Sequence, residues 1–100
     1  MATVQFFQPH EGRRFDGPLD LNELLVRHPA ATFFMRAGEV VAREVDVREG
    51  DLLVIDRAAQ PGPGRTLVVA RGGEIRLERY RPTGEEAELW GVVTHVIRKL

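Results

Sequence analysis

The chain has 100 residues, of which 43% are hydrophobic and 29% charged, a composition typical of one soluble globular domain and not of a disordered segment. Its net charge of −1 and its pI near 6.3 argue against direct nucleic-acid binding, which normally requires a basic surface. The absence of cysteine excludes disulfides and thiolate chemistry, and no apolar run reaches the ~18 residues of a membrane span, so we expect a cytoplasmic protein with no membrane contact.

The first 18 residues are rich in turn-forming proline and glycine and also carry three phenylalanines. This mixture predicts an N-terminal arm over residues 1–18, with the phenylalanines as anchors, followed by a domain over residues 19–100.

A short helix is predicted after the arm. Leucines recur at helical spacing from Leu21 to Leu25, and either Asp20 or Asn22 can cap the start. Pro29 disfavours helical geometry at the residue before it, so the helix is expected to have about two turns.

From residue 31 the sequence becomes typical of β structure. The valines from Val40 to Val47 lie among charges and indicate an extended or irregular stretch. The pair Gly72-Gly73 favours a primed hairpin turn, and Gly91 favours a bulge or bend in the last strand. Five segments rich in β-branched and aromatic residues are predicted as strands: residues 32–36, 52–55, 66–71, 74–80 and 88–97.

The last of these segments is apolar on both faces. A sheet with one solvated face needs only one apolar set, so the surplus predicts burial on both sides and favours a homodimer. Trp90 is interpreted as a core residue in preference to a partner's anchor. The proposed dimer or partner surface has Leu89, Val93 and Ile97 on one side and Trp90, Val92 and Val96 on the other.

Three runs together resemble the UmuD/LexA peptidase family: Thr32–Ala37, Gly50–Asp56 and Leu89–Ile97. Within that family the chain is most similar to UmuD, the accessory subunit of an SOS-induced translesion DNA polymerase. The resemblance implies a mostly β fold, α+β at most. The expected architecture is the curled antiparallel sheet of the LexA/signal-peptidase type with one short N-terminal helix.

The resemblance also identifies the positions of the family's catalytic pair. Members activate a serine with a neutral, desolvated lysine, and the family pattern places Val41 at the serine and Glu78 at the lysine. The sequence contains no serine and no cysteine, and its single lysine is Lys99. We therefore predict that the protein is not an enzyme. We expect Glu78 to be solvated or paired with an arginine, for which the candidates are Arg76, Arg43 and Arg36.

Other nucleophiles and ligands have weaker support. Thr32, Thr66 and Thr94 lie in predicted strands, where threonine is favoured for structural reasons. The histidines at positions 10, 28 and 95 lack a ligand spacing, so no metal or other cofactor is predicted.

The resemblance implies a non-catalytic, UmuD-like accessory protein that acts by protein contact in the SOS response and translesion synthesis. It is expected to form a homodimer. The other candidate partners are an error-prone polymerase subunit, a RecA filament and an active UmuD-like chain. Two alternatives stay open: a self-cleaving peptidase with an unrecognised nucleophile, and a stand-alone dimerisation module of a repressor-like protein. The chain also starts about where the trimmed form of the family would start.

Overall fold

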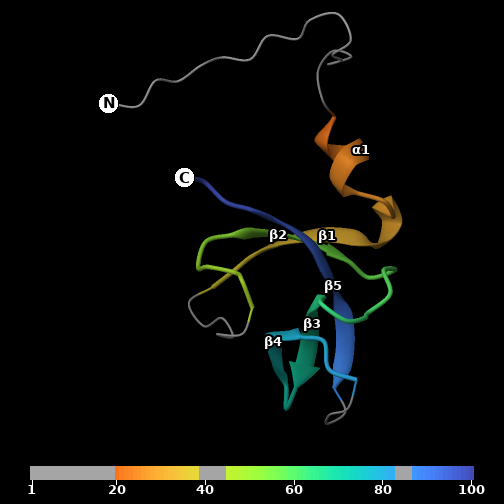
Figure 1. Ribbon diagram of the computed structural model, residues 1–100, viewed down its shortest axis with the longest axis vertical. Coiled ribbons are helices and arrows are strands. Elements are labelled where there is room, and N and C mark those ends of the chain that lie inside the picture. The colour runs from red at the N-terminus through yellow and green to blue at the C-terminus, as the bar shows by residue number, and fades with distance from the viewer. Residues whose placement is uncertain (1–19, 39–44, 83–86) are drawn as a thin grey trace, which may run out of the picture.

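An open five-stranded antiparallel sheet dominates the fold (Figure 1). The computed structural model describes residues 20–38, 45–82 and 87–100, so the predicted arm and Val41 lie outside the described residues. Neighbouring strands follow the order β1-β2-β5-β3-β4, and every pair is antiparallel. The prediction of a mostly β fold with one short helix is confirmed. The elements are α1 (Leu21–Leu25), η1 (Pro29–Ala31), β1 (Thr32–Arg36), β2 (Leu52–Asp56), β3 (Thr66–Arg71), β4 (Glu74–Arg79) and β5 (Glu88–Ile97).

Helix α1 begins at the predicted cap. The Asp20 carboxylate accepts a hydrogen bond from the backbone N–H of Asn22 at 2.9 Å, which satisfies one of the free donors of the first turn. The helix has only five residues, and neither α1 nor η1 contributes a buried side chain. Leu21 and Leu24 are 60% and 54% exposed. The helix therefore stands beside the sheet instead of covering it, as Figure 1 shows.

The β3–β4 hairpin has the predicted turn. Gly72 and Gly73 both have positive φ, at 55° and 82°, which matches a primed turn and explains the Gly-Gly pair.

Strand β5 lies at the centre of the sheet, with β2 along one side and β3 along the other. Its register shifts twice: Trp90 is the extra residue opposite Val68 and Val69, and Thr94 is the extra residue opposite Val54 and Ile55. Such bulges bend a strand and increase its twist, which fits a sheet that curls along β5.

The two bulges overturn the strict alternation expected for β5. Residues that pair in register share a face, so Leu89, Val92 and Ile97 lie on one face of the sheet. Val93 and Val96 lie on the other face. The predicted grouping of Val93 with Leu89 and Ile97, and of Val92 with Val96, is wrong because each bulge reverses the parity.

The main cluster of buried apolar residues lies on the face that contains Val93, and Val54, Val69 and Val92 are buried on the opposite face. Ala37, Leu53, Ile55 and Val68 form the buried centre of the main cluster. Partly buried residues surround this centre: Phe33, Met35, Val47, Leu77 and Val93.

Candidate functional site

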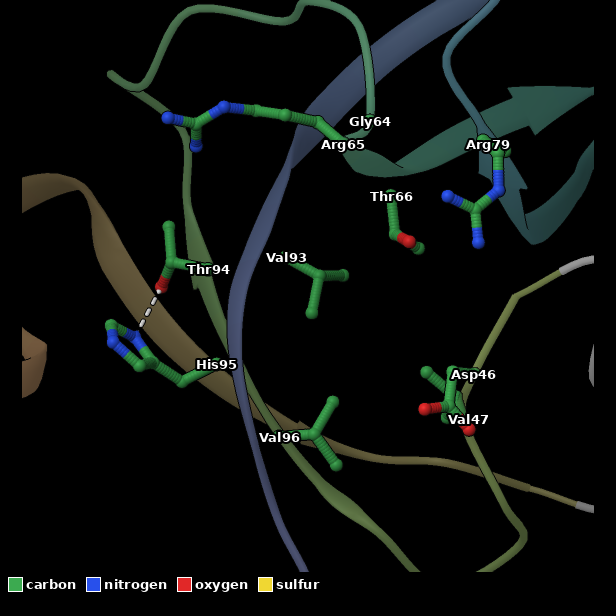
Figure 2. Close-up of a pocket in the computed structure, with 10 residues that line it drawn as sticks. All are labelled: Asp46, Val47, Gly64, Arg65, Thr66, Arg79, Val93, Thr94, His95 and Val96. Carbon is green, nitrogen blue, oxygen red and sulfur yellow. Dashed lines mark hydrogen bonds between the residues drawn. The ribbon is translucent and has the colours of Figure 1, made fainter.

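A groove of about 470 Å³ opens on the core side of the sheet, between the segment that enters β2 and strands β3, β4 and β5 (Figure 2). Figure 2 shows Val93 and Val96 directed into the hollow, while Thr94 and His95 extend from the opposite side of β5. This division agrees with the strand register. The side chains that form the floor and walls are Asp46, Val47, Thr66, Arg79, Val93 and Val96.

The family pattern places the nucleophile at Val41, which lies outside the described residues. The described chain resumes at Val45, which is buried, and Asp46 forms one wall of the groove. The groove therefore offers an apolar floor, with the acidic Asp46 and the basic Arg79 on its walls.

Glu78, at the lysine position, does not line this groove. It pairs in register with Leu67, while its neighbour Arg79 pairs with Thr66 on the groove side. Successive residues of a strand face opposite sides of a sheet, so Glu78 lies on the face away from the groove.

Glu78 forms a two-point ion pair with Arg71 across the hairpin. Nε and Nη2 of Arg71 lie 2.8 and 3.1 Å from the two carboxylate oxygens, and the side chains are 23% and 25% exposed. The hydrogen bond from Arg71 lowers the pKa of Glu78, against the opposing effect of burial. A carboxylate kept ionised in this way is a weak base and carries no proton to donate.

The expectation that an arginine pairs with Glu78 is confirmed, but the partner was not among the three candidates. Arg76 pairs instead with Glu74 at 3.1 Å. Arg36 donates to the backbone carbonyl of Gly50 at 2.9 Å, and Arg43 lies outside the described residues.

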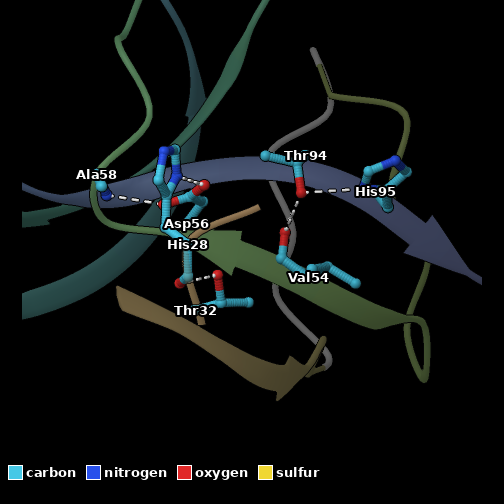
Figure 3. Close-up of polar contacts among 7 residues, drawn as sticks. All are labelled: His28, Thr32, Val54, Asp56, Ala58, Thr94 and His95. Atoms are coloured by element: carbon cyan, nitrogen blue, oxygen red, sulfur yellow. Dashed lines mark hydrogen bonds and ion pairs between the residues drawn. The ribbon is translucent and has the colours of Figure 1, made fainter. Parts of the chain in front are cut away.

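Two threonines have structural hydrogen bonds (Figure 3). The Thr32 hydroxyl donates to the carbonyl of His28 at 2.8 Å. The Thr94 hydroxyl donates to the carbonyl of Val54 at 3.3 Å, which ties the bulge to β2, and Nδ1 of His95 lies 3.0 Å from the same hydroxyl oxygen. Because the Thr94 proton is directed at a carbonyl, the imidazole does not receive it in this arrangement.

Two buried carboxylates hold the ends of β2, and the sequence interpretation missed the partners of both. Asp51, 1% exposed, accepts hydrogen bonds from the guanidinium of Arg98 and from the backbone N–H of Arg48. The Arg98 hydrogen bond lowers its pKa from 3.8 to about 2. The signal in the sequence was an acidic residue at each end of a strand that is apolar on both faces.

Asp56 connects the strand to the helical segment. Its carboxylate lies 2.6 Å from Nδ1 of His28 and accepts the backbone N–H of Ala58 at 2.8 Å (Figure 3). Burial raises the pKa of Asp56, but the hydrogen bonds from His28 and Ala58 outweigh it, and the net pKa is lowered.

The residues predicted for a dimer or partner surface fall into two groups. Val92 is fully buried, whereas Val93 is partly buried, packs against the core and lines the groove. The other four are 36–39% exposed: Leu89, Trp90, Val96 and Ile97.

Trp90 is not the core residue that we expected. Its exposed fraction is 36%, and the guanidinium carbon of Arg57 lies 5.9 Å from the centre of its ring. Residue 90 occupies a bulge and does not follow the alternation of its strand, and its side chain is partly accessible.

Within residues 20–38, 45–82 and 87–100, no three His, Asp or Glu side chains gather in a way that could hold a metal ion. The described part of the chain also has no helix long and apolar enough to cross a membrane.

Comparison with known proteins places the chain among several bacterial relatives. It is 35% identical to Protein ImpA of Salmonella typhimurium over 99 residues, covering 81% of this chain and 68% of that protein. It is 31% identical to Protein MucA of Escherichia coli over 97 residues, covering 77% and 66%. A shorter match, 31% over 64 residues, covers 62% of this chain and 32% of the LexA repressor of Cellvibrio japonicus (strain Ueda107). No protein-family model matches the chain.

Proposed function

The chain belongs to the UmuD/LexA peptidase family, and we propose that it is a non-catalytic member that acts by protein contact in the SOS response and translesion DNA synthesis. In this role it resembles the UmuD accessory subunit. It forms a homodimer and contacts an error-prone polymerase subunit, a RecA filament or an active UmuD-like chain.

One observation carries the non-catalytic part of the proposal: the side chain at the lysine position is a carboxylate held by Arg71 on the sheet face away from the groove. The family's chemistry needs a neutral amine beside a hydroxyl. An ionised carboxylate held by a guanidinium supplies no such base, and Val41 supplies no hydroxyl. The absence of serine and cysteine from the whole sequence supports the same conclusion independently of any alignment.

The contact role draws support from the exposed apolar side chains of β5. Leu89 and Trp90 are consecutive residues at its start, and a partly accessible tryptophan is a common anchor for a protein partner. Val96 and Ile97 are the corresponding exposed pair at its end. We assign partner contact to these four residues.

The proposal is tested by mixing the purified chain with Protein MucA of Escherichia coli and recording native mass spectra. We expect a homodimer of this chain and a mixed species that contains both proteins. A Trp90→Ala variant tests whether Trp90 anchors the mixed contact, with Ile75→Ala as its control. Ile75 is also an exposed apolar residue, 46% accessible, but it lies on β4. Homodimers without any mixed species would favour the alternative of a repressor-like dimerisation module, which the LexA repressor match supports.

A further inference from the structure

The two edges of the sheet are built differently. Strand β4 forms one edge, and four of its six residues are charged, which is a common protection against pairing with another strand. Strand β1 forms the other edge with the sequence Thr-Phe-Phe-Met-Arg, and its single charged residue is Arg36. The Arg36 guanidinium bends back onto the carbonyl of Gly50, at 2.9 Å, so it is directed at its own chain.

The outer edge of β1 presents a regular set of backbone groups. The carbonyl of Ala31 accepts the N–H of Arg57 at 2.9 Å, and the N–H of Ala37 donates to the carbonyl of Asp51 at 2.8 Å. Backbone groups of alternate residues point to the same side of a strand, so residues 31, 33, 35 and 37 bond to β2. The N–H and C=O groups of the alternating residues between them therefore point outward: Thr32, Phe34 and Arg36. Within the described residues, β2 is the one strand that pairs with β1.

We propose that a second copy of this chain pairs antiparallel with the outer edge of β1, about a two-fold axis at Phe34. This proposal rests on the homodimer of the proposed function and places its self-contact on β1, so the four exposed residues of β5 are left for contact with other partners. The dimer would join two five-stranded sheets into one continuous sheet. A two-fold contact of this kind uses the same surface on both copies, so the strand must be complementary to itself.

The register about Phe34 satisfies that condition. In this register the outward-pointing backbone N–H and C=O groups of all three residues in each copy can bond to the partner. A shift of one residue would instead place at the contact backbone groups that already bond to β2. The proposed register sets Phe34 opposite the partner's Phe34, where aromatic pairs are favoured. On the core face it sets Phe33 opposite the partner's Met35, and it sets Thr32 opposite the partner's Arg36. No like charges face each other.

Side-chain exposure agrees with this arrangement. Phe34 is 52% exposed, although both neighbouring residues are partly buried and pack against the core. A large exposed aromatic in the middle of an edge strand is a liability in a monomer and a contact in a dimer. The second copy covers this ring and extends the row of Phe33 and Met35 across the axis.

Cysteine cross-linking tests the register, because the natural chain has no cysteine. Directly opposite residues in a hydrogen-bonded antiparallel pair have Cα atoms about 5.5 Å apart, which is within the range of a disulfide. We expect Phe34→Cys to form a covalent dimer under mild oxidation. The control is Ile75→Cys, on the other edge strand and 46% exposed, which should stay at the monomer mass. Equal cross-linking of the two variants would overturn the proposal.

A second variant measures the contact itself. Phe34→Lys places two like charges opposite each other on the axis, and we expect the dimer Kd from sedimentation to rise at least about tenfold. The control Ile75→Lys should leave it unchanged. A wild-type dimer that Phe34→Lys leaves intact would overturn the β1 edge as the interface and leave the proposed accessory role standing. Self-cleavage of the wild type would instead overturn the accessory role, with the cross-linking result unaffected.

Discussion

The guanidinium of Arg98 donates two hydrogen bonds to the buried carboxylate of Asp51, from Nε to Oδ1 at 2.8 Å and from Nη2 to Oδ2 at 2.6 Å. Arg98 directly follows β5, and Asp51 directly precedes β2. The pair therefore fastens the end of the central strand to the start of its neighbour. Asp51 also accepts the backbone N–H of Arg48, which holds the turn leading into β2.

Removing this pair should destabilise the fold more than removing an exposed pair. Arg98→Gln leaves a buried carboxylate without its charged partner, and such groups are costly. The matched control is Arg76→Gln, because Arg76 and its partner Glu74 are 54% and 69% exposed and such pairs contribute about 1 kcal/mol or less. Urea unfolding of both variants checks the order, and equal losses would contradict the structural role of Asp51.

Stability should fall at acidic pH. The pKa of Asp51 is lowered to about 2, and the pKa values of Asp56 and Glu78 are also lowered. The unfolded chain therefore binds protons more readily than the folded one. The stabilisation by these ionised carboxylates is complete above their pKa in the unfolded chain, which is near 4. It is lost as the pH falls through their lower pKa values in the folded protein.

The measurement for this prediction is the free energy of unfolding at pH steps from about 5 down to about 2. We expect a steady decrease across this window for the natural chain. Asp51→Asn should show a smaller decrease, because the variant has no carboxylate to protonate at this position. An unchanged slope in the variant would show that Asp51 does not contribute to the acid response.

Gly91 should not tolerate a methyl group. A Cβ at this position would lie 2.6 Å from Cγ2 of Ile55, a fully buried side chain. Overpacking of this kind typically costs about 1–3 kcal/mol, so Gly91→Ala should lower the stability by that amount. Gly62→Ala is the control, because nothing lies within 4 Å of the corresponding position.

A double-mutant cycle with Ile55→Leu identifies the cause. Leucine has nearly the same volume but no Cγ2 branch at the point of contact, so part of the Gly91→Ala loss should be recovered. Strictly additive losses would mean that the contact with Ile55 is not responsible.

A charge exchange tests the ion pair at the lysine position. Glu78→Lys places a second cation beside Arg71 and should cost about 1 kcal/mol or more, since the pair is only partly exposed. Adding Arg71→Glu restores opposite charges and should recover most of the loss. A lack of recovery would mean that the pair does not hold residue 78 in place.

Local sequence signals predicted the elements of the fold but not the contacts between them. Asp20 and the pair Gly72-Gly73 were predictable because a cap and a primed turn depend on adjacent residues. The bulges at Trp90 and Thr94 were not, because they depend on how β5 meets two different neighbours. Each bulge moved the following side chains of β5 to the opposite face of the sheet from the one predicted.

The same distinction applies to the candidate site. The resemblance identified Glu78, and the cost of burying an unpaired carboxylate predicted either solvation or an arginine partner. The partner, Arg71, lies on the opposite strand of the hairpin, four residues along from Leu67, which pairs with Glu78. A long-reaching contact of this kind is set by the orientation of two long side chains on the same face, which composition and spacing do not reveal. The pairing of Asp56 with His28 likewise depends on a non-local contact, because the backbone N–H of Arg57 donates to the carbonyl of Ala31 and holds the end of β2 beside the segment after α1.

We propose above that this family member acts by binding other proteins and does not cleave itself. The most direct test is an intact-mass time course of the purified chain at alkaline pH, alone and with a RecA filament, together with a Val41→Ser variant. We predict a single species at the full-length mass throughout. Val41→Ser alone should also stay intact, because residue 78 remains a carboxylate held by Arg71 and no lysine is poised to take the serine proton. A discrete fragment of the natural chain, formed at a rate independent of protein concentration, would contradict the claim and identify the protein as a self-cleaving peptidase.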